Sequence, residues 1–487
     1  MNATTSEMTG AGPFTDEEII SDARRIFELQ RKHRWEMART TPAERVARLE
    51  RLRKAVLQHR DELARAVHED FRKHASEFDF TEIQPLLIEL RHTMKHLAEW
   101  LAPRPVETPL VLAGTRSEVR YEPRGVVLIL GPWNYPFNLV IAPLVSAIAA
   151  GNTAILRPSE KTPRVAEVVG RMIRSTFDER EVAIVGGGVS VAEALLDLPF
   201  DHFFFTGSTR IGKKVMVKAA EHLASVTLEL GGKSPVIVDA SADLKATAER
   251  VVWGKFINAG QTCIAPDFTL VHASVHDDFI RELRAAIERT YGPTEEARRS
   301  SPDLPRVITR EASRRLGELL DQTVKQGARV ELGGAYDVEE RYVAPTVLTG
   351  ITPSSPIMRE EIFGPILPVL TWRTMDELLE RVRTGDKPLA LYVFARNEDF
   401  VEELLRSTTA GATVVNNVAV HFGNANLPFG GIGASGVGNY HGEYGVRTFS
   451  HERAVMRQGR PMLLKHLYPP YGAKTRRLLA WVERISG

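Results

Sequence analysis

The chain has one cysteine among its 487 residues, so it can form no internal disulfide, which fits a reducing cytosol. Neither sign of charge is in excess. The chain has 63 Lys plus Arg and 62 Asp plus Glu, so its net charge is +1. A nucleic-acid or anionic-membrane partner would need a concentrated basic surface, which this balance does not favour. We interpret a small basic pair, Arg476 and Arg477, as a solvated helix face.

Long hydrophobic runs are absent too. The N-terminus lacks a basic start followed by an apolar stretch, so no secretory signal is visible. Apolar runs such as residues 139–150 are too short to span a bilayer, and Pro143 interrupts this one. These absences predict a cytoplasmic protein without a membrane anchor, and no motif predicts a metal site.

The composition is otherwise ordinary for a globular protein, with 43% hydrophobic and 26% charged residues. A chain of this length exceeds one compact core, so two or three structural units are expected. Charged and apolar residues follow a helical period over residues 16–72 and 81–100. Pro103 and Pro105 then break this pattern, and residues 107–121 are typical of a β-hairpin.

The next stretch alternates short apolar strands with helices. Strands are predicted at residues 126–130, 153–156, 182–185, 203–205 and 226–230. Continuous apolar runs are typical of strands buried on both faces. Strands alternating with helices indicate a parallel sheet with right-handed crossovers, so this part of the chain is predicted to be Rossmann-like.

A second α/β unit begins at Ser234. Its strands are predicted at residues 236–238, 268–271, 329–332 and 365–370, with a helix over residues 244–258. The polar, proline-flanked stretch 293–305 is predicted to be a surface loop. The fold class is therefore α/β, with a Rossmann-like unit, a second α/β unit and a small β element.

Cys263 is the first residue with a chemical signal. It stands just past a predicted helix, in the segment Asn-Ala-Gly-Gln-Thr-Cys, where Gly260 favours a constrained turn that presents the sulfur to a cleft. A lone cysteine is more commonly a buried structural residue. From the residues alone, both interpretations stay open.

Glu229 ends an otherwise apolar strand and is followed closely by Gly231 and Gly232. In a doubly wound sheet, ligands bind outside the carboxyl ends of the strands. A carboxyl group in apolar surroundings can have a raised pKa and act as a general base. An ion pair with a nearby Lys or Arg is the equal alternative.

Two weaker signals also follow strands. Asn134 lies between prolines, and its amide could donate to a developing oxyanion, although a plain turn residue is the alternative. Residues 207–212 open a helix whose backbone N–H groups would suit a pyrophosphate. Their spacing is not G-x-G-x-x-G, so the standard dinucleotide fingerprint is absent and a glycine-capped turn remains possible.

Together and in this order, the segments resemble the aldehyde dehydrogenase superfamily, and the match covers nearly the whole chain. The matching signatures are residues 131–136, 157–160, 205–212, 229–235, 260–266 and 361–365. Further details are similar to the class 3 branch. They are residues 263–267, 427–431, 440–442 and the tail segment 468–471.

The resemblance implies NAD(P)-dependent oxidation of an aldehyde to a carboxylic acid through a thiohemiacetal and a thioester. Cys263 would be the nucleophile and Glu229 the base that activates the hydrolytic water, with Asn134 and the Cys263 backbone N–H as oxyanion donors. The cofactor would be NAD, with NADP possible, held by Trp133, Arg157, Ser159, Glu160, Gly207, Ser208, Gly212, Leu230, Gly231, Glu361 and Phe363. Tyr135, Trp253 and His421 would line a pocket for medium-chain aliphatic or aromatic aldehydes.

The resemblance also implies a domain organisation. Residues 1–104 and 124–230 would form the NAD(P)-binding domain, 231–434 the catalytic domain, 105–123 and 435–455 an oligomerisation element, and 456–487 a C-terminal tail. The hairpin would cross to a partner subunit together with a late strand at residues 447–455. The class 3 likeness favours a homodimer.

Two departures and two alternatives stay open. Family members usually carry Lys before Pro-Ser-Glu, where this chain has Arg157, so the choice between NAD and NADP is not settled. Residues 478–485 lack the hydrophobic anchor of membrane-bound fatty-aldehyde members. A CoA-acylating enzyme is disfavoured because Glu229 serves hydrolysis. A catalytically silent binding homologue is disfavoured because Cys263, Glu229 and Asn134 are all present.

Overall fold

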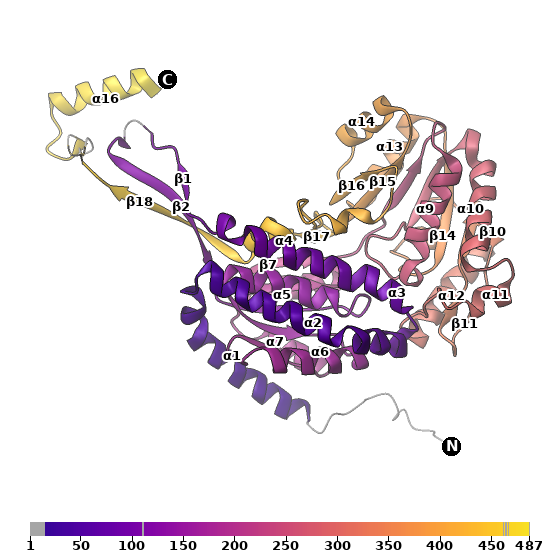
Figure 1. Ribbon diagram of the computed structural model, residues 1–487. Helices are drawn as coiled ribbons and strands as arrows, with labels where there is room; N and C mark the ends of the chain where they lie inside the picture. The colour runs from indigo at the N-terminus through magenta and orange to yellow at the C-terminus, as the bar shows by residue number, and fades with distance from the viewer. Residues whose placement is uncertain (1–14, 110–111, 461, 463–464, 466, 487) are drawn as a thin grey trace.

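The computed structural model describes residues 15–109, 112–460, 462, 465 and 467–486. Figure 1 shows two large lobes, each built of helices around a sheet, and a thin β ribbon that projects away from them. The lobes contain a six-stranded and a seven-stranded sheet, and the ribbon is a three-stranded sheet. Among the described residues, no helix has both the length and the apolar character needed to cross a membrane.

The six-stranded sheet confirms the Rossmann-like prediction. Its order is β17-β7-β6-β3-β4-β5, and β3 to β7 run parallel. The strands are β3 (Val126–Leu130), β4 (Thr153–Arg157), β5 (Val182–Ile184), β6 (His202–Thr206), β7 (Ser225–Glu229) and β17 (Gly436–Val437). The short β17 comes from much later in the chain and pairs antiparallel with β7. No local pattern predicted that addition.

Helices surround this sheet. They are α1 (Asp16–Ala38), α2 (Pro42–Phe71), α3 (Ala75–Phe78), α4 (Gln84–Trp100), α5 (Asn138–Ala150), α6 (Pro163–Thr176), α7 (Val189–Leu196) and α8 (Thr209–Glu221), with a π-helical turn η1 (Asp79–Ile83) before α4. The predicted helical stretch 16–72 is two helices, each started by a capping box. Thr15 and Thr41 are the N-caps, with Glu18 and Glu44 at the third helical position.

The second lobe is built on the seven-stranded sheet β10-β13-β14-β9-β8-β15-β16. Its strands are β8 (Pro235–Val238), β9 (Phe268–His272), β10 (Arg329–Leu332), β13 (Thr346–Thr349), β14 (Ile366–Trp372), β15 (Ala390–Phe394) and β16 (Ala412–Val415). All neighbours run parallel except β10, which is antiparallel to β13. The helices are α9 (Leu244–Phe256), α10 (His276–Tyr291), α11 (Glu295–Ser300), α12 (Arg310–Lys325), α13 (Met375–Arg383) and α14 (Glu398–Ser407).

The prediction of a loop over residues 293–305 is wrong in part, because α11 lies within it. Thr294 caps this helix by accepting a hydrogen bond from the N–H of Ala297 at 3.2 Å. Acidic residues in the first turn complement the helix dipole, and Arg298 in the last turn is buried. A Thr cap followed by two Glu is a helix-start signal that the flanking prolines obscured.

The projecting ribbon joins β1 (Arg104–Val106), β2 (Thr115–Pro123) and β18 (Ser450–Gln458), all antiparallel. The predicted hairpin is present, but its first strand is Arg104–Val106, and residues 110–111 lie outside the described part of the chain. The late strand predicted at 447–455 begins later, because α15 (Gly442–Thr448) precedes it. The domain boundaries stay a prediction.

Candidate active site

The candidate nucleophile Cys263 follows a left-handed turn after α9. Asn258, Ala259 and Gly260 have φ angles of 54°, 53° and 74°. Non-glycine residues rarely adopt this left-handed backbone conformation, so two in succession indicate that neighbouring segments hold the backbone in place. A side chain at position 260 would collide with the backbone of Gly364. The constrained turn predicted at Gly260 is present.

Side chains from both lobes hold this turn. The carboxylate of Glu77 accepts a hydrogen bond from the N–H of Asn258 at 2.9 Å. The Gln261 amide donates to the carbonyl oxygens of Asn258 at 3.0 Å and Arg306 at 3.2 Å, and accepts from the N–H of Ile308 at 2.9 Å. The position of Cys263 is therefore fixed by contacts from distant parts of the chain.

Cys263 and Glu229 line the same cavity, although Glu229 ends β7 in the first lobe and Cys263 belongs to the second. Most of the cavity wall is aliphatic or aromatic. The larger such side chains are Leu139, Trp253, Ile257, Phe422, Phe429 and Tyr440. A nucleophile and a carboxyl group thus meet in an apolar cavity between the two lobes.

Glu229 is buried, and neither of its carboxyl oxygens has a hydrogen-bond partner among the described residues. This burial raises the pKa of Glu229 well above its usual range. The alternative of an ion pair with a neighbouring Lys or Arg is therefore wrong. An unpartnered carboxyl group facing an apolar cavity can exchange a proton with a water or a thiol placed there.

The Cys263 thiol is also held in its protonated form. Burial, together with the nearby charges of Glu361 and Glu229, raises the pKa of Cys263 to about 12. The backbone N–H groups of Cys263 and Ile264 act in the opposite direction, because they favour the thiolate. A base beside the thiol is thus needed at neutral pH, and Glu229 supplies a carboxyl group in the same cavity.

Asn134 is buried next to the nucleophile turn. Its Nδ2 donates to the backbone carbonyl oxygen of Gln261 at 3.0 Å, and the backbone carbonyl oxygen of Asn134 accepts from Nδ2 of Asn258 at 2.9 Å. The neighbouring Tyr135 hydroxyl lies 2.6 Å from Oγ1 of Thr262. The Asn134 amide is therefore fixed in orientation, and Nδ2 carries a second hydrogen that can serve another acceptor.

Two of the three predicted pocket residues, Tyr135 and Trp253, line the cavity. His421 does not, but its ring stacks on Phe429, which does, with centroids 5.6 Å apart. Burial and then the charge of His441 lower the pKa of His421 to about 4, so it is neutral at pH 7. Sequence reasoning missed Phe429, Tyr440 and His441 as pocket residues, although their segments had been noted as class 3 features.

The strand order of the first sheet reverses between β3 and β6, since β3 pairs with β4 on one side and with β6 on the other. Ligands of open α/β sheets bind in the crevice outside the carboxyl ends at such a point. The Asn134 loop leaves β3 there, and Gly207 leaves β6. Ser208 is the N-cap of α8, but its side chain makes no capping bond. The N–H groups of this first turn can therefore face an anion.

Arg157 and Glu160, two predicted cofactor residues, form an ion pair with Nη1 and Oε2 2.8 Å apart. The same guanidinium donates from Nη2 to the carbonyl oxygens of Gly187 and Gly188, both at 3.1 Å. The Arg157 side chain is only 9% exposed. Arg157 thus offsets the charge of Glu160 and fixes the glycine loop after β5.

Three further predicted positions are tightly packed. Oγ of Ser159 accepts from the N–H of Lys161 at 3.2 Å. A side chain at Gly212 would come too close to Leu230, so only glycine lets α8 approach the end of β7.

The last predicted cofactor residues form two contacting pairs, and the charge of one of them, Glu361, acts on Cys263. Trp133 and Phe363 meet edge to face, with ring centroids 5.4 Å apart, and Phe363 has a positive φ of 49°. A side chain at Gly231 would collide with the carboxylate of Glu361. Burial, followed by the charge of Asp267, raises the pKa of Glu361 to about 8.

Comparison with known proteins identifies the chain. A family model described as the aldehyde dehydrogenase family matches residues 2–455. The chain belongs to this family.

Several relatives and solved structures resemble this member of the family. The 4,4'-diaponeurosporen-aldehyde dehydrogenase of Staphylococcus aureus is 43% identical over 90% of the chain and 94% of that protein. Aldehyde dehydrogenase family 3 member A2 of Mus musculus is 41% identical over 88% and 87%, and the dimeric NADP-preferring enzyme of Canis lupus familiaris is 38% identical over 94% and 99%. The substrate-bound structure of Staphylococcus aureus AldH matches with a TM-score of 0.88 and 40% identity, over 96% of the chain and 99% of that chain.

These comparisons confirm the predicted class 3 likeness, the fold class and the reaction class. The aldehyde dehydrogenase described here is an oxidoreductase that oxidises aldehydes with NAD or NADP. A structure of the Bacillus cereus enzyme with NAD⁺ matches with a TM-score of 0.82 and 27% identity, over 90% of this chain and 89% of that chain. The carboxyl ends of the parallel strands and the first turn of α8, which has no side-chain cap, would hold such a dinucleotide. The roles of individual residues stay predictions.

Proposed function

We propose that this aldehyde dehydrogenase acts through a covalent intermediate on Cys263, with Glu229 as its base and Asn134 as an oxyanion donor. The observation that carries the proposal is the shared cavity, which is lined by the chain's one thiol and by a buried carboxyl group without a hydrogen-bond partner among the described residues. Glu229 takes the thiol proton, and the thiolate attacks the aldehyde carbon. The carbonyl oxygen gains negative charge and accepts hydrogen bonds from Asn134 Nδ2 and the Cys263 N–H.

The bound cofactor supplies the hydride acceptor of the oxidation. The chain's own residues hold it: the first turn of α8 for the phosphates, Glu160 for the adenosine ribose, and Glu361 and Phe363 for the nicotinamide ribose. Glu229 passes the thiol proton to solvent and then accepts a proton from water, whose oxygen attacks the thioester carbon. The carbon–sulfur bond breaks, and the carboxylic acid leaves while Cys263 regains a thiolate.

The cavity wall favours apolar substrates. Trp253, Phe429 and Tyr440 offer aromatic faces, and burial raises the pKa of Tyr440 well above its usual range, so it stays neutral. We expect medium-chain aliphatic and aromatic aldehydes to give the highest kcat/KM, and aldehydes with a carboxylate near the carbonyl to give values lower by about 10²-fold, because their charge would be buried without a partner. A panel of aldehydes, each scored by kcat/KM, tests this. Equal values for charged and apolar aldehydes of one size would contradict it.

The cofactor preference follows from the Arg157–Glu160 pair. Glu160 can accept hydrogen bonds from ribose hydroxyls and would repel a 2′-phosphate, but Arg157 offsets its charge at 2.8 Å. We expect NAD to be preferred in kcat/KM and NADP to be used measurably. Arg157→Lys, which restores the usual family residue but loses a planar donor, should lower the use of NADP relative to NAD. A preference for NADP in the unsubstituted enzyme would overturn the expectation.

The ribbon supports a homodimer. Figure 1 shows β1, β2 and β18 standing away from both lobes, and β18 is exposed over most of its length. An isolated ribbon of this kind is marginal in water and gains stability by packing elsewhere. The outer strand β16 of the seven-stranded sheet has an unpaired edge that another strand could join. Sedimentation at micromolar concentration should give twice the 54.2 kDa chain mass. A monomeric mass would refute the homodimer.

A further inference from the structure

Beneath the loop that carries Asn134 lies an ion pair that is shut off from solvent. Nζ of Lys73 is 2.8 Å from Oε1 of Glu82, and neither side chain has any exposed surface. Removing two charges from water costs free energy, which their attraction offsets only when further hydrogen bonds satisfy both groups. A buried pair is thus weak evidence for a stabilising role. Its hydrogen-bond partners indicate instead that it holds the loop that carries Asn134.

Glu82 holds the end of this loop and the start of α5. Its Oε2 accepts hydrogen bonds from the N–H groups of Phe137 at 3.0 Å and Asn138 at 3.2 Å. Phe137 is the N-cap of α5 and offers no side-chain bond, so Glu82 supplies the anion that a helix start favours. Glu82 lies in the π-helical turn Asp79–Ile83, in which the adjacent Thr81 lines the cavity. Such turns are frequent at functional sites.

Lys73 holds the other half of the loop. Its ammonium lies 4.2 Å from the centre of the Tyr135 ring and donates to the carbonyl oxygen of Asn134 at 3.4 Å. The same carbonyl oxygen accepts from Asn258, which belongs to the turn before Cys263. One ion pair therefore holds the loop at both ends, at a point where the loop meets the nucleophile turn.

We propose that Lys73 and Glu82 are positioning residues for the acylation step and act through Asn134. The inference rests on the oxyanion role proposed above for Asn134. Donors that are fixed before the reaction stabilise the transition state, and a displacement of about 1 Å can cost about 10²-fold in rate. Neither Lys73 nor Glu82 lines the cavity, so both act on the chemistry through the residues they hold in place.

The test is the paired variant Lys73→Met with Glu82→Gln. It removes both members of the ion pair at similar size, so neither is left buried without the other. The burst of NADH that reports acylation and hydride transfer should slow about 10- to 100-fold, while the Kd for the cofactor and the KM for the aldehyde change little. An unchanged burst rate would overturn the proposal.

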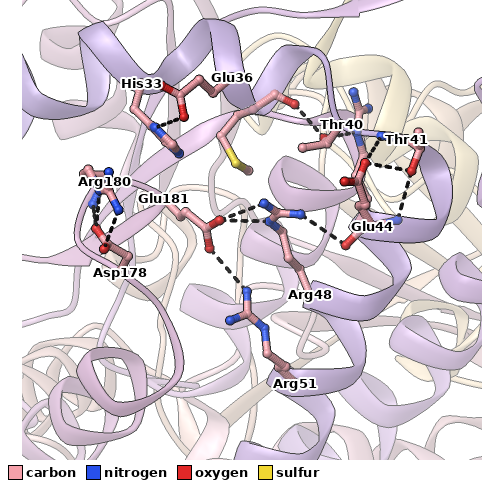
Figure 2. A network of polar contacts seen from close by, with 12 residues as sticks. His33, Glu36, Thr40, Thr41, Glu44, Arg48, Arg51, Asp178, Arg180 and Glu181 are labelled. Carbon is pink, nitrogen blue, oxygen red and sulfur yellow. Dashed lines mark hydrogen bonds and ion pairs between the residues drawn. The ribbon is translucent and has the colours of Figure 1, made fainter.

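A matched control uses another ion pair of the same lobe. Arg48 and Glu181 lie 2.8 Å apart with side chains 19% and 14% exposed, in the network of Figure 2. Neither residue lines the cavity. Arg48→Met with Glu181→Gln should lower the melting temperature without slowing the burst. If the control slows the burst as much as the Lys73 and Glu82 variant, the effect is general destabilisation and the proposal is wrong.

The background variant Asn134→Ala separates positioning from packing. If the ion pair acts through Asn134, adding Lys73→Met and Glu82→Gln to Asn134→Ala should slow the burst by no more than about twofold. The effects of substitutions at residues that act together do not add. Equal slowing in both backgrounds would overturn the proposal. An unchanged burst in Asn134→Ala alone would overturn both the oxyanion role of Asn134 and the positioning role of the ion pair. A burst that is slowed in Asn134→Ala but normal in the ion-pair variant would overturn only the positioning role.

A milder variant covers the case in which the neutral pair does not fold. Glu82→Asp keeps the charge but shortens the side chain, so it can no longer reach both Phe137 and Asn138 from its place beside Lys73. The burst should slow in Glu82→Asp with little change in melting temperature. Glu82→Gln, which keeps the length but loses the charge, should show a slowed burst as well. A normal burst in a folded Glu82→Asp would contradict the proposal.

Discussion

Cys263→Ser should abolish aldehyde oxidation while leaving cofactor binding nearly intact. A hydroxyl is a far weaker nucleophile than a thiolate, and Cys263 is the chain's only thiol, so no other residue can take its place. The side chain changes little in size, and the polar contacts that fix the turn come from Asn258 and Gln261 rather than from the sulfur. Steady-state NADH formation and a titration of cofactor binding measure the two effects.

The control for this variant is its melting temperature, which should stay close to that of the unsubstituted enzyme. Near-normal turnover in a folded Cys263→Ser variant would rule out the covalent mechanism through Cys263. Loss of cofactor binding together with turnover would instead show that Cys263 contributes to the cofactor site, which the structure gives no reason to expect.

Glu229→Gln should separate hydrolysis from the earlier steps. The amide keeps the shape of the side chain but removes the base, and losing a positioned general base costs about 10²–10⁴-fold in the step it serves. Thioester should therefore accumulate, with a burst of at most one NADH per active site followed by slow turnover. Mass spectrometry should find the acyl group on Cys263.

The pH profile adds a second measurement for Glu229. Because the pKa of Glu229 is raised, its carboxyl group gains a proton at a pH well above the range in which an ordinary carboxyl group titrates. Deacylation should therefore slow as the pH falls through that higher range. This dependence should disappear in Glu229→Gln. Because Glu229 also removes the thiol proton in the proposed mechanism, and the pKa of Cys263 is raised, the burst should be slower in the variant than in the unsubstituted enzyme. Full-rate steady-state turnover would show that the base has been misassigned.

The helices and strands of the first lobe followed from the local pattern. Apolar runs ending in glycine marked β3 and β6, and their alternation with helices predicted the parallel sheet, because such signals depend on neighbours in the chain. The short α11 was missed because prolines on both sides outweighed its cap. The pairing of β17 with β7 was also missed, since it joins residues that lie far apart in the sequence.

The sequence by itself determined the family, the reaction class and the three residues proposed for catalysis, because each carries its signal within a few positions. Only the tertiary structure decided that Glu229 has no ion-pair partner, that Arg157 is paired with Glu160, and that Phe429, Tyr440 and His441 complete the pocket. It alone brought Lys73 and Glu82 beneath Asn134. Burial and charge pairing arise from contacts between distant segments, and a local pattern of residues contains no information about which distant segments meet.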